Sequence, residues 1–195
     1  MFTIYGDRQS GNCLKVLYAA NHLGLEHSWV DVDVLDGGAR MPESLARNPA
    51  GQVPYVVFDD GRVLAQSNAI LLYLGHDTAL VPEDPWERAQ VHQWLFWEQY
   101  SHEPAIAVCR FEMFYRGQTA AERDSGRVAK GEAALDLMDA HLAANPRMAG
   151  ERLTVADIAL IAYTRLAHEG GFDLAERSHV RRWIAEVEGS LAIGA

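Results

Sequence analysis

The sequence has 195 residues, of which 49% are hydrophobic, so the chain can bury one sizeable core or two smaller ones. A formal net charge of −10 argues against nucleic acid or an anionic membrane surface as a partner. No apolar run reaches the length of a membrane span and the N-terminus lacks a secretory profile, so we expect a cytoplasmic protein. Cys13 and Cys109 are far apart and the histidines are scattered, so we expect neither a disulfide framework nor a metal site.

The N-terminal residues predict a β-α-β unit. An apolar run at residues 2–5 indicates a short strand, and a polar loop that contains glycine follows it. From Cys13 the apolar positions repeat at helical spacing, and the helix is expected to end near His22, with Gly24 just beyond it. Residues 28–34 alternate between apolar and acidic side chains, as a half-buried strand does. The apolar face of this strand is predicted to contain Val30, Val32 and Val34.

Residues 48–74, with the sequence NPAGQVPYVVFDDGRVLAQSNAILLYL, contain three local signals. Pro54 precedes a β-branched and aromatic run, where its missing N–H is tolerated, and the Val53-Pro54 bond is a candidate for the cis form. The dipeptide Asp60-Gly61 joins two short apolar runs and predicts an antiparallel hairpin. Ser67 is a favourable N-cap for a helix that continues to Leu74.

The start of this helix suits a carboxylate, because unpaired N–H groups and the positive end of the helix dipole lie there. The side chains of Gln66 and Ser67 would add hydrogen bonds to the same carboxylate. NPAGQVP, followed by a hairpin and QSNAILLYL, closely resembles the glutathione-binding half of the cytosolic glutathione transferase family. The resemblance implies that the backbone of Val53, next to a cis Pro54, pairs with the cysteinyl unit of glutathione. It also implies that Gln66 and Ser67 hold the γ-glutamyl carboxylate.

From Trp86 onward strand signals vanish and only helices are predicted. Residues 86–114 carry apolar side chains at helical spacing, and Pro104 is expected to bend or interrupt the helix. An amphipathic helix is expected to end at Asn145-Pro146, and a last helix covers roughly residues 178–191. The C-terminal part of the chain is therefore predicted to be all-helical.

Between these two helices, Thr154 and Asp157 match a capping box ahead of a strongly apolar helix at residues 158–167. The string TVADIA resembles the folding signature of the transferase family's C-terminal domain, and we expect Asp157 to have a structural role. The resemblance covers essentially the whole chain and implies an α/β plus all-α architecture, the glutathione transferase fold. We predict a thioredoxin-like βαβ-ββα domain at 1–76, a linker at 77–85 and an all-helical substrate-binding domain at 86–195.

Transferases of this family use the thiolate of glutathione as nucleophile, so a donor aimed at the sulfur from the first helix would lower the thiol pKa. The loop RQSGNC resembles the S-x-x-C arrangement of serine-type members, which implies that Ser10 faces the thiolate; a plain turn or N-cap serine is the alternative. Cys13 is either a nucleophile that forms a mixed disulfide with glutathione, as in cysteine-type relatives, or an inert packed residue. Asn12 is a further candidate donor to the sulfur.

The glycine end of glutathione needs a cation or an amide donor for its carboxylate. The resemblance assigns this task to Arg40 and Gln52, with a solvated surface arginine as the alternative for Arg40. The electrophile is expected beside the aromatic side chains that cluster within residues 86–115; the alternatives for this face are core and dimer interface. His102 is a further candidate acid or base in the same region.

The resemblance thus implies a glutathione S-transferase that conjugates glutathione, its co-substrate, to small hydrophobic electrophiles in detoxification, without a metal and as a homodimer. One alternative is a non-catalytic glutathione-binding or interaction module with the same fold. Another is a glutathione-dependent thiol-disulfide or isomerase variant that uses Cys13. The intact Val53-Pro54 and Gln66-Ser67 pairs favour the enzyme, because a scaffold has no need of them.

Overall fold

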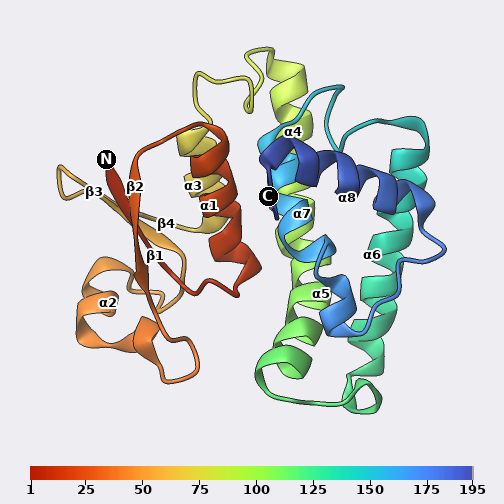
Figure 1. Cartoon of the computed structure of the whole chain (residues 1–195), viewed down its shortest axis with the longest axis horizontal. Coiled ribbons are helices and arrows are strands. Elements are labelled where there is room, and N and C mark those ends of the chain that lie inside the picture. The colour runs from red at the N-terminus through yellow and green to blue at the C-terminus, as the bar shows by residue number, and fades with distance from the viewer. Residues whose placement is uncertain (195) are drawn as a thin grey trace. The chain divides into compact units, whose positions relative to one another are not determined.

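The computed structural model describes residues 1–194, and these form two compact units (Figure 1). The first unit spans Met1–His76, and the second begins at Asp77. The first unit contains β1 (Phe2–Gly6), α1 (Gly11–His22), β2 (His27–Asp31), α2 (Pro42–Arg47), β3 (Tyr55–Phe58), β4 (Val63–Ala65) and α3 (Ser67–Leu74). The second unit contains α4 (Pro85–Trp97), α5 (Glu103–Arg110), α6 (Ser125–Ala144), α7 (Val155–Thr164) and α8 (Ser178–Leu191).

The four strands form one sheet in the order β2-β1-β3-β4. Strand β1 runs parallel to β2 and antiparallel to β3, and β4 runs antiparallel to β3. The hairpin predicted at Asp60-Gly61 is confirmed: Gly61 has a left-handed backbone with φ 83°, and the N–H of Arg62 donates to Asp60 Oδ1 at 3.0 Å. The predicted thioredoxin-like domain followed by a helical domain is likewise confirmed.

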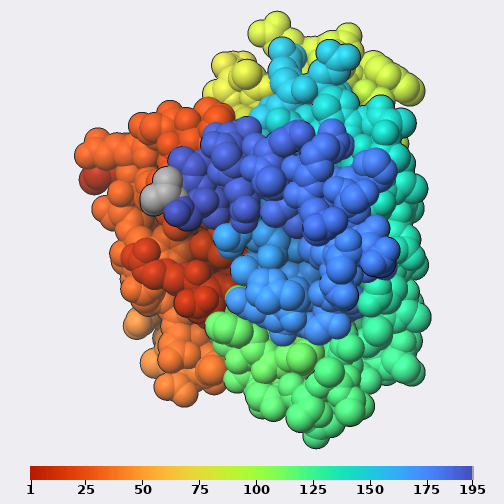
Figure 2. All heavy atoms as spheres, turned by 45° about the vertical axis from the view of Figure 1, so that its right-hand side comes forward, coloured from red at the N-terminus to blue at the C-terminus, as the bar shows by residue number. Residues whose placement is uncertain are grey.

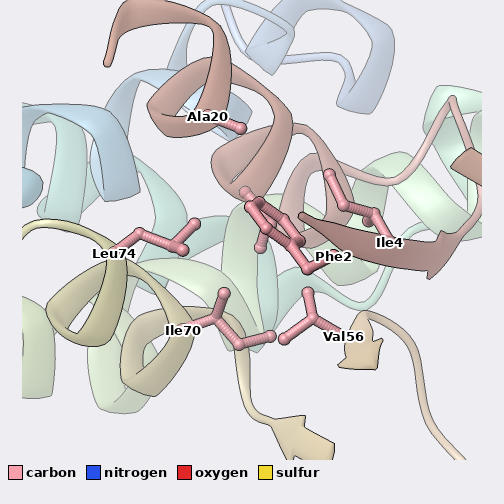
Figure 3. Close-up of a cluster of buried hydrophobic side chains, with 7 residues drawn as sticks. Phe2, Ile4, Ala20, Val56, Ile70 and Leu74 are labelled. Atoms are coloured by element: carbon pink, nitrogen blue, oxygen red, sulfur yellow. The ribbon is translucent and has the colours of Figure 1, made fainter. Parts of the chain in front are cut away.

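The core of the first unit lies between one face of the sheet and the helices α1 and α3 (Figure 3). Side chains alternate across a strand, so every second residue of β1 points to this face, and turns of the two helices supply the opposing apolar surface. The buried cluster consists of Phe2, Ile4, Val16, Ala20, Val56, Ile70 and Leu74. This packing fixes the positions at which α1 and α3 begin.

The opposite face of the sheet is covered by α2. Tyr5 and Tyr55, which alternate with the core residues of β1 and β3, stack their rings with centroids 4.8 Å apart. The guanidinium of Arg47, the last residue of α2, lies 4.8 Å from the centre of the Tyr5 ring. The sheet is therefore sandwiched between α1 and α3 on one side and α2 on the other.

Strand β2 is shorter than predicted, and the assignment of its buried face was wrong for Val30. The ladder ends at Asp31, because Asp33 Oδ1 then accepts hydrogen bonds from two following backbone N–H groups at 2.8 and 3.0 Å and forms a turn. Val30 is 40% exposed, whereas Trp29 packs against the core. Alternation of valine and aspartate indicated a strand, but it did not reveal which side faced the core.

The helix predicted over residues 86–114 is interrupted, as expected. Helix α4 ends at Trp97, a π-helical turn covers Glu98–His102, and α5 begins at Glu103. Pro104 lies in the first turn of α5, where its missing N–H is tolerated, so the irregular turn precedes the proline. The predicted helix is thus divided into α4 and α5, and a second π-helical turn covers Phe111–Tyr115.

Residues 77–84 contain no helix or strand, yet they pack with the second unit. Leu80 is buried, and its carbonyl accepts a hydrogen bond from the N–H of Val155, the first residue of α7, at 3.0 Å. The segment predicted as a linker therefore joins the helical unit before α4 begins. Helix α7 ends at Thr164, three residues before the predicted end.

Asp157 anchors the start of α7. Its Oδ2 accepts hydrogen bonds from the N–H of Thr154 at 3.0 Å and from the Thr154 hydroxyl at 3.2 Å, which confirms the predicted capping box. Its Oδ1 accepts from Met148 N–H at 3.0 Å and from the indole N–H of Trp183 at 2.9 Å. Burial raises the pKa of this carboxyl, and the four donated bonds act against that rise. The expected structural role of Asp157 fits these contacts.

Helix α8 has the predicted bounds and closes the helical unit on one side. Its buried face consists of Val180, Trp183, Val187 and Leu191. Its opposite face forms part of the surface of the helical unit in Figure 2, drawn in dark blue.

Within residues 1–194, no helix combines the length and the apolar character that a membrane span requires.

Candidate functional site

Three segments singled out in the sequence meet at one edge of the sheet. Tyr55, at the start of β3, pairs with Tyr5 near the end of β1 and with Ala65 at the end of β4. The segments that follow β1, precede β3 and follow β4 therefore emerge side by side. They are the loop at residues 7–10, the Val53-Pro54 pair and the Gln66-Ser67 pair.

The segment before β3 is braced by a buried asparagine. Asn48 Nδ2 donates to the carbonyl of Gln52 at 2.8 Å, and Asn48 Oδ1 accepts from Ala50 N–H at 3.2 Å. Gly51 has φ +63°, and a Cβ added there would lie 3.2 Å from Cγ of Arg40, so the exposed Arg40 passes beside this loop. The Val53-Pro54 bond is cis, the form for which the sequence made it a candidate.

The start of α3 differs from the prediction by one residue. Gln66, not Ser67, is the N-cap, because Gln66 has the non-helical backbone with φ 72° and ψ 111° while Ser67 already belongs to the helix. The Gln66 side chain makes no capping bond and is exposed, whereas Ser67 is 5% exposed. A serine in the first turn presents its backbone N–H toward the open end of the helix, which still suits an anion.

The start of α1 holds the candidate thiol-activating residues. Ser10 is the N-cap: its carbonyl accepts from Cys13 N–H at 3.0 Å and from Leu14 N–H at 2.9 Å. Its hydroxyl makes no capping bond, and its proximity to the Cys13 thiol acts to lower the pKa of that thiol. The Ser10 side chain is therefore not occupied in holding the helix end.

Cys13 is enclosed in the fold. It is 0% exposed, and a Cβ added to Gly6 of β1 would lie 2.8 Å from its sulfur. Burial raises the pKa of the Cys13 thiol to about 12, so the group keeps its proton at neutral pH. A nucleophilic cysteine needs a thiolate and access to its partner, and these surroundings provide neither.

A polar cluster that the sequence did not single out joins the two helix starts. The hydroxyl of Ser67 donates to Asn12 Oδ1 at 3.1 Å. Lys15 Nζ donates to the same oxygen at 2.8 Å and lies 3.5 Å from Asn68 Oδ1. Lys15 is 0% exposed, and its neighbours along α1 are mostly apolar. The sequence signal that could have indicated a buried lysine was this single cation within an apolar run.

Family comparisons identify the chain. A model described as the glutathione S-transferase N-terminal domain matches residues 9–77, and one described as the C-terminal domain matches residues 118–186. Over 192 residues the sequence is 32% identical to glutathione S-transferase 3 of Zea mays. The alignment covers 92% of this chain and 86% of that protein. The chain belongs to the glutathione S-transferase family.

Two solved bacterial structures resemble the transferase along nearly all of its length. One is a glutathione S-transferase from Pseudomonas fluorescens Pf-5, with a TM-score of 0.93, 43% identity and coverage of 96% of this chain and 94% of that one. The other is from Xanthobacter autotrophicus Py2, with a TM-score of 0.90, 43% identity and coverage of 96% and 93%. The chain is thus a glutathione S-transferase by sequence and by fold.

In the helical unit of the transferase, the aromatic residues of the interrupted helix have different environments. Trp94 is buried, whereas Tyr100 is 87% exposed at the rim of a groove of about 850 Å³. Trp97, Ala105 and Leu137 also line this groove. His102 is 0% exposed, and its Nε2 lies 3.0 Å from the Thr164 hydroxyl, so it is placed as a core histidine.

Proposed function

We propose that this transferase binds glutathione along the sheet edge described above and activates its thiol for attack on small hydrophobic electrophiles. The observation that carries the proposal is the meeting of the cis Val53-Pro54 pair, the Gln66-Ser67 pair and the start of α1 at one edge. A tripeptide with a carboxylate at each end and a thiol in the middle matches the donors available there.

The γ-glutamyl carboxylate would lie at the start of α3. Ser67 offers its backbone N–H and hydroxyl, the helix dipole adds a favourable field, and the exposed Gln66 amide can reach over the same place. The backbone of Val53 would pair with the cysteinyl unit, as a strand pairs with an edge. At the other end, Arg40 and Gln52 would bind the glycyl carboxylate.

The thiol would lie at the start of α1, under Ser10 and Asn12. Hydrogen bonds donated to a thiolate favour the ionised form and lower the pKa of the thiol, whose proton leaves to solvent. The sulfur then forms a bond with an electrophilic carbon, and the leaving group departs with the electron pair.

Cys13 is proposed to have a packing role rather than a nucleophilic one. Burial keeps the Cys13 thiol protonated, and a thiol sulfur is a weak acceptor, so the Ser10 hydroxyl can turn from Cys13 to a glutathione thiolate, which is a stronger acceptor. Thiol-disulfide exchange through Cys13 is disfavoured for the same reason.

A conjugation assay tests the proposal. Purified transferase, glutathione and 1-chloro-2,4-dinitrobenzene should give the thioether product at a rate above that of the uncatalysed mixture. A protein that retains glutathione in equilibrium dialysis but shows no turnover with any of a panel of electrophiles would support the non-catalytic binding module instead. A protein that does neither would contradict both.

A second copy of the chain is the proposed occupant of the groove beside Tyr100. An aromatic side chain that is 87% exposed, beside a groove lined by apolar residues together with Asp124, Arg127 and Lys130, is typical of a protein interface. A homodimer is the assembly expected from the family resemblance. Sedimentation at micromolar concentration should give a species of twice the 21.6 kDa chain mass. A monomer at that concentration would contradict this part of the proposal.

A further inference from the structure

Lys15 is a buried, charged residue of the first unit to which the proposed function gives no role. It is one of two lysines in the chain, which otherwise uses arginine for its cations, and it is 0% exposed. Burying an ammonium group is unfavourable unless oxygen atoms replace its lost water. Such a group is retained at a cost to stability, which suggests a role beyond packing.

The bond from Lys15 fixes the orientation of the Asn12 amide. An ammonium group can only donate hydrogen bonds, so the Asn12 atom that lies 2.8 Å from Lys15 Nζ must be the carbonyl oxygen. The amide NH₂ of Asn12 therefore points away from Lys15 and carries the donors of that side chain. Asn12 sits in the first turn of α1, two residues after Ser10, where the glutathione sulfur is proposed to lie.

The same bond releases the hydroxyl of Ser67. In the structure this hydroxyl donates to Asn12 Oδ1 at 3.1 Å. If Ser67 turned its hydrogen to a carboxylate, the half-buried Asn12 oxygen would still accept from Lys15 and would not be left unsatisfied. Lys15 thus lowers the free-energy cost of turning the Ser67 hydroxyl from Asn12 to a bound carboxylate.

We propose that Lys15 is a positioning residue of the glutathione site: by holding Asn12 Oδ1 it aims the Asn12 amide at the glutathione sulfur and frees the Ser67 hydroxyl for the γ-glutamyl carboxylate. This inference rests on the proposed function. The positive charge of Lys15 also favours the thiolate and the γ-glutamyl carboxylate of bound glutathione, because charges interact more strongly through the low-dielectric protein interior than through water.

Other charged and titratable groups also lie near the start of α1. In the loop after β1, Asp7 is negative and disfavours an added anion, while Arg8 forms an ion pair with Asp31 at 3.2 Å; Cys13 is neutral. Helix α1 also carries Tyr18 and His22, while α3 contains Tyr73 and no charged residue. Lys15 is therefore the cation that the two packed helices bring to this place.

The test uses Lys15→Met, which keeps most of the length of the side chain and removes its charge and donors. The readout is the ultraviolet absorbance of the bound glutathione thiolate, titrated with pH, together with the dissociation constant of glutathione. Lys15→Met should raise the pKa of the bound thiol by about one unit, a tenfold loss of thiolate below that pKa. In an Asn12→Ala background, Lys15→Met should shift this pKa by less than half as much.

Arg88→Met serves as the matched control, because it removes an exposed cation from α4 in the other unit and should leave both readouts unchanged. Lys15→Gln, which keeps a donor without the charge, should raise the pKa by less than Lys15→Met and serves as the second variant if Lys15→Met fails to fold. A folded Lys15 variant with the wild-type thiol pKa would overturn this inference alone. Absence of bound thiolate in the wild type would overturn the proposed function as well.

Discussion

Replacing Ser10 by alanine is expected to lower kcat/KM for glutathione conjugation by about 10- to 1000-fold, the usual loss for one donor to a developing or full anion. The Ser10 hydroxyl is not used to cap α1, and the neutral Cys13 sulfur is a weak acceptor, so the serine hydrogen can be donated to the glutathione thiolate instead. The loss should accompany a higher pKa of the bound thiol. Steady-state kinetics across pH, with a fixed electrophile, provide the measurement.

Two controls separate this account from its rivals. Ser28→Ala removes an exposed hydroxyl from the edge strand β2 of the same unit and should not change the kinetics. Cys13→Ala should stay within about threefold of wild type, because a buried neutral thiol supplies no thiolate. The opposite order, with activity lost in Cys13→Ala and kept in Ser10→Ala, would establish the thiol-disulfide alternative and remove Ser10 from the chemistry.

Replacing Asp157 by alanine is expected to lower the free energy of unfolding by about 3 to 5 kcal/mol. The carboxylate accepts four hydrogen bonds in a fully buried position, so its removal leaves the N–H of Met148 and of Thr154 and the indole of Trp183 without their acceptor. Urea denaturation followed by circular dichroism measures the change. Conjugation activity of the fraction that remains folded should be close to that of the wild type.

Asp84→Ala is the matched control for that experiment. Asp84 also caps a helix, since its Oδ1 accepts from the N–H groups of Trp86 and Glu87 at 3.0 Å, but it does so in solvent. An exposed cap of this kind contributes about 1 kcal/mol. Equal losses for the two aspartates would mean that burial and the Trp183 bond add nothing.

Local signals in the sequence were sufficient for much of the fold. The Asp60-Gly61 turn, the capping box at Thr154 and the bounds of α8 each depend on residues close together in the chain, and the structure confirms them. The buried side of β2 was wrong for Val30 because alternation has two possible phases, and only packing against β1 and α1 selects one.

The candidate site was predicted less completely, because its contacts join residues far apart in the chain. Ser67 was expected to cap α3, but Gln66 takes the unusual backbone at that point, and the Ser67 hydroxyl turns to Asn12 instead. Lys15 was missed because its partners become visible only when α1 and α3 are packed together. Sequence spacing indicated which residue types could bind glutathione, while the bonds between them required the fold.

The central claim is that glutathione binds at the sheet edge with its γ-glutamyl carboxylate at the start of α3. Calorimetric titration of glutathione into the wild type and into Ser67→Ala tests it most directly, with Ser28→Ala as control. The account predicts one glutathione per chain in the wild type and control, and a dissociation constant about 10- to 100-fold higher in Ser67→Ala, the loss expected for a hydrogen bond to a charged group. No heat of binding in the wild type, or equal affinity in Ser67→Ala, would contradict it.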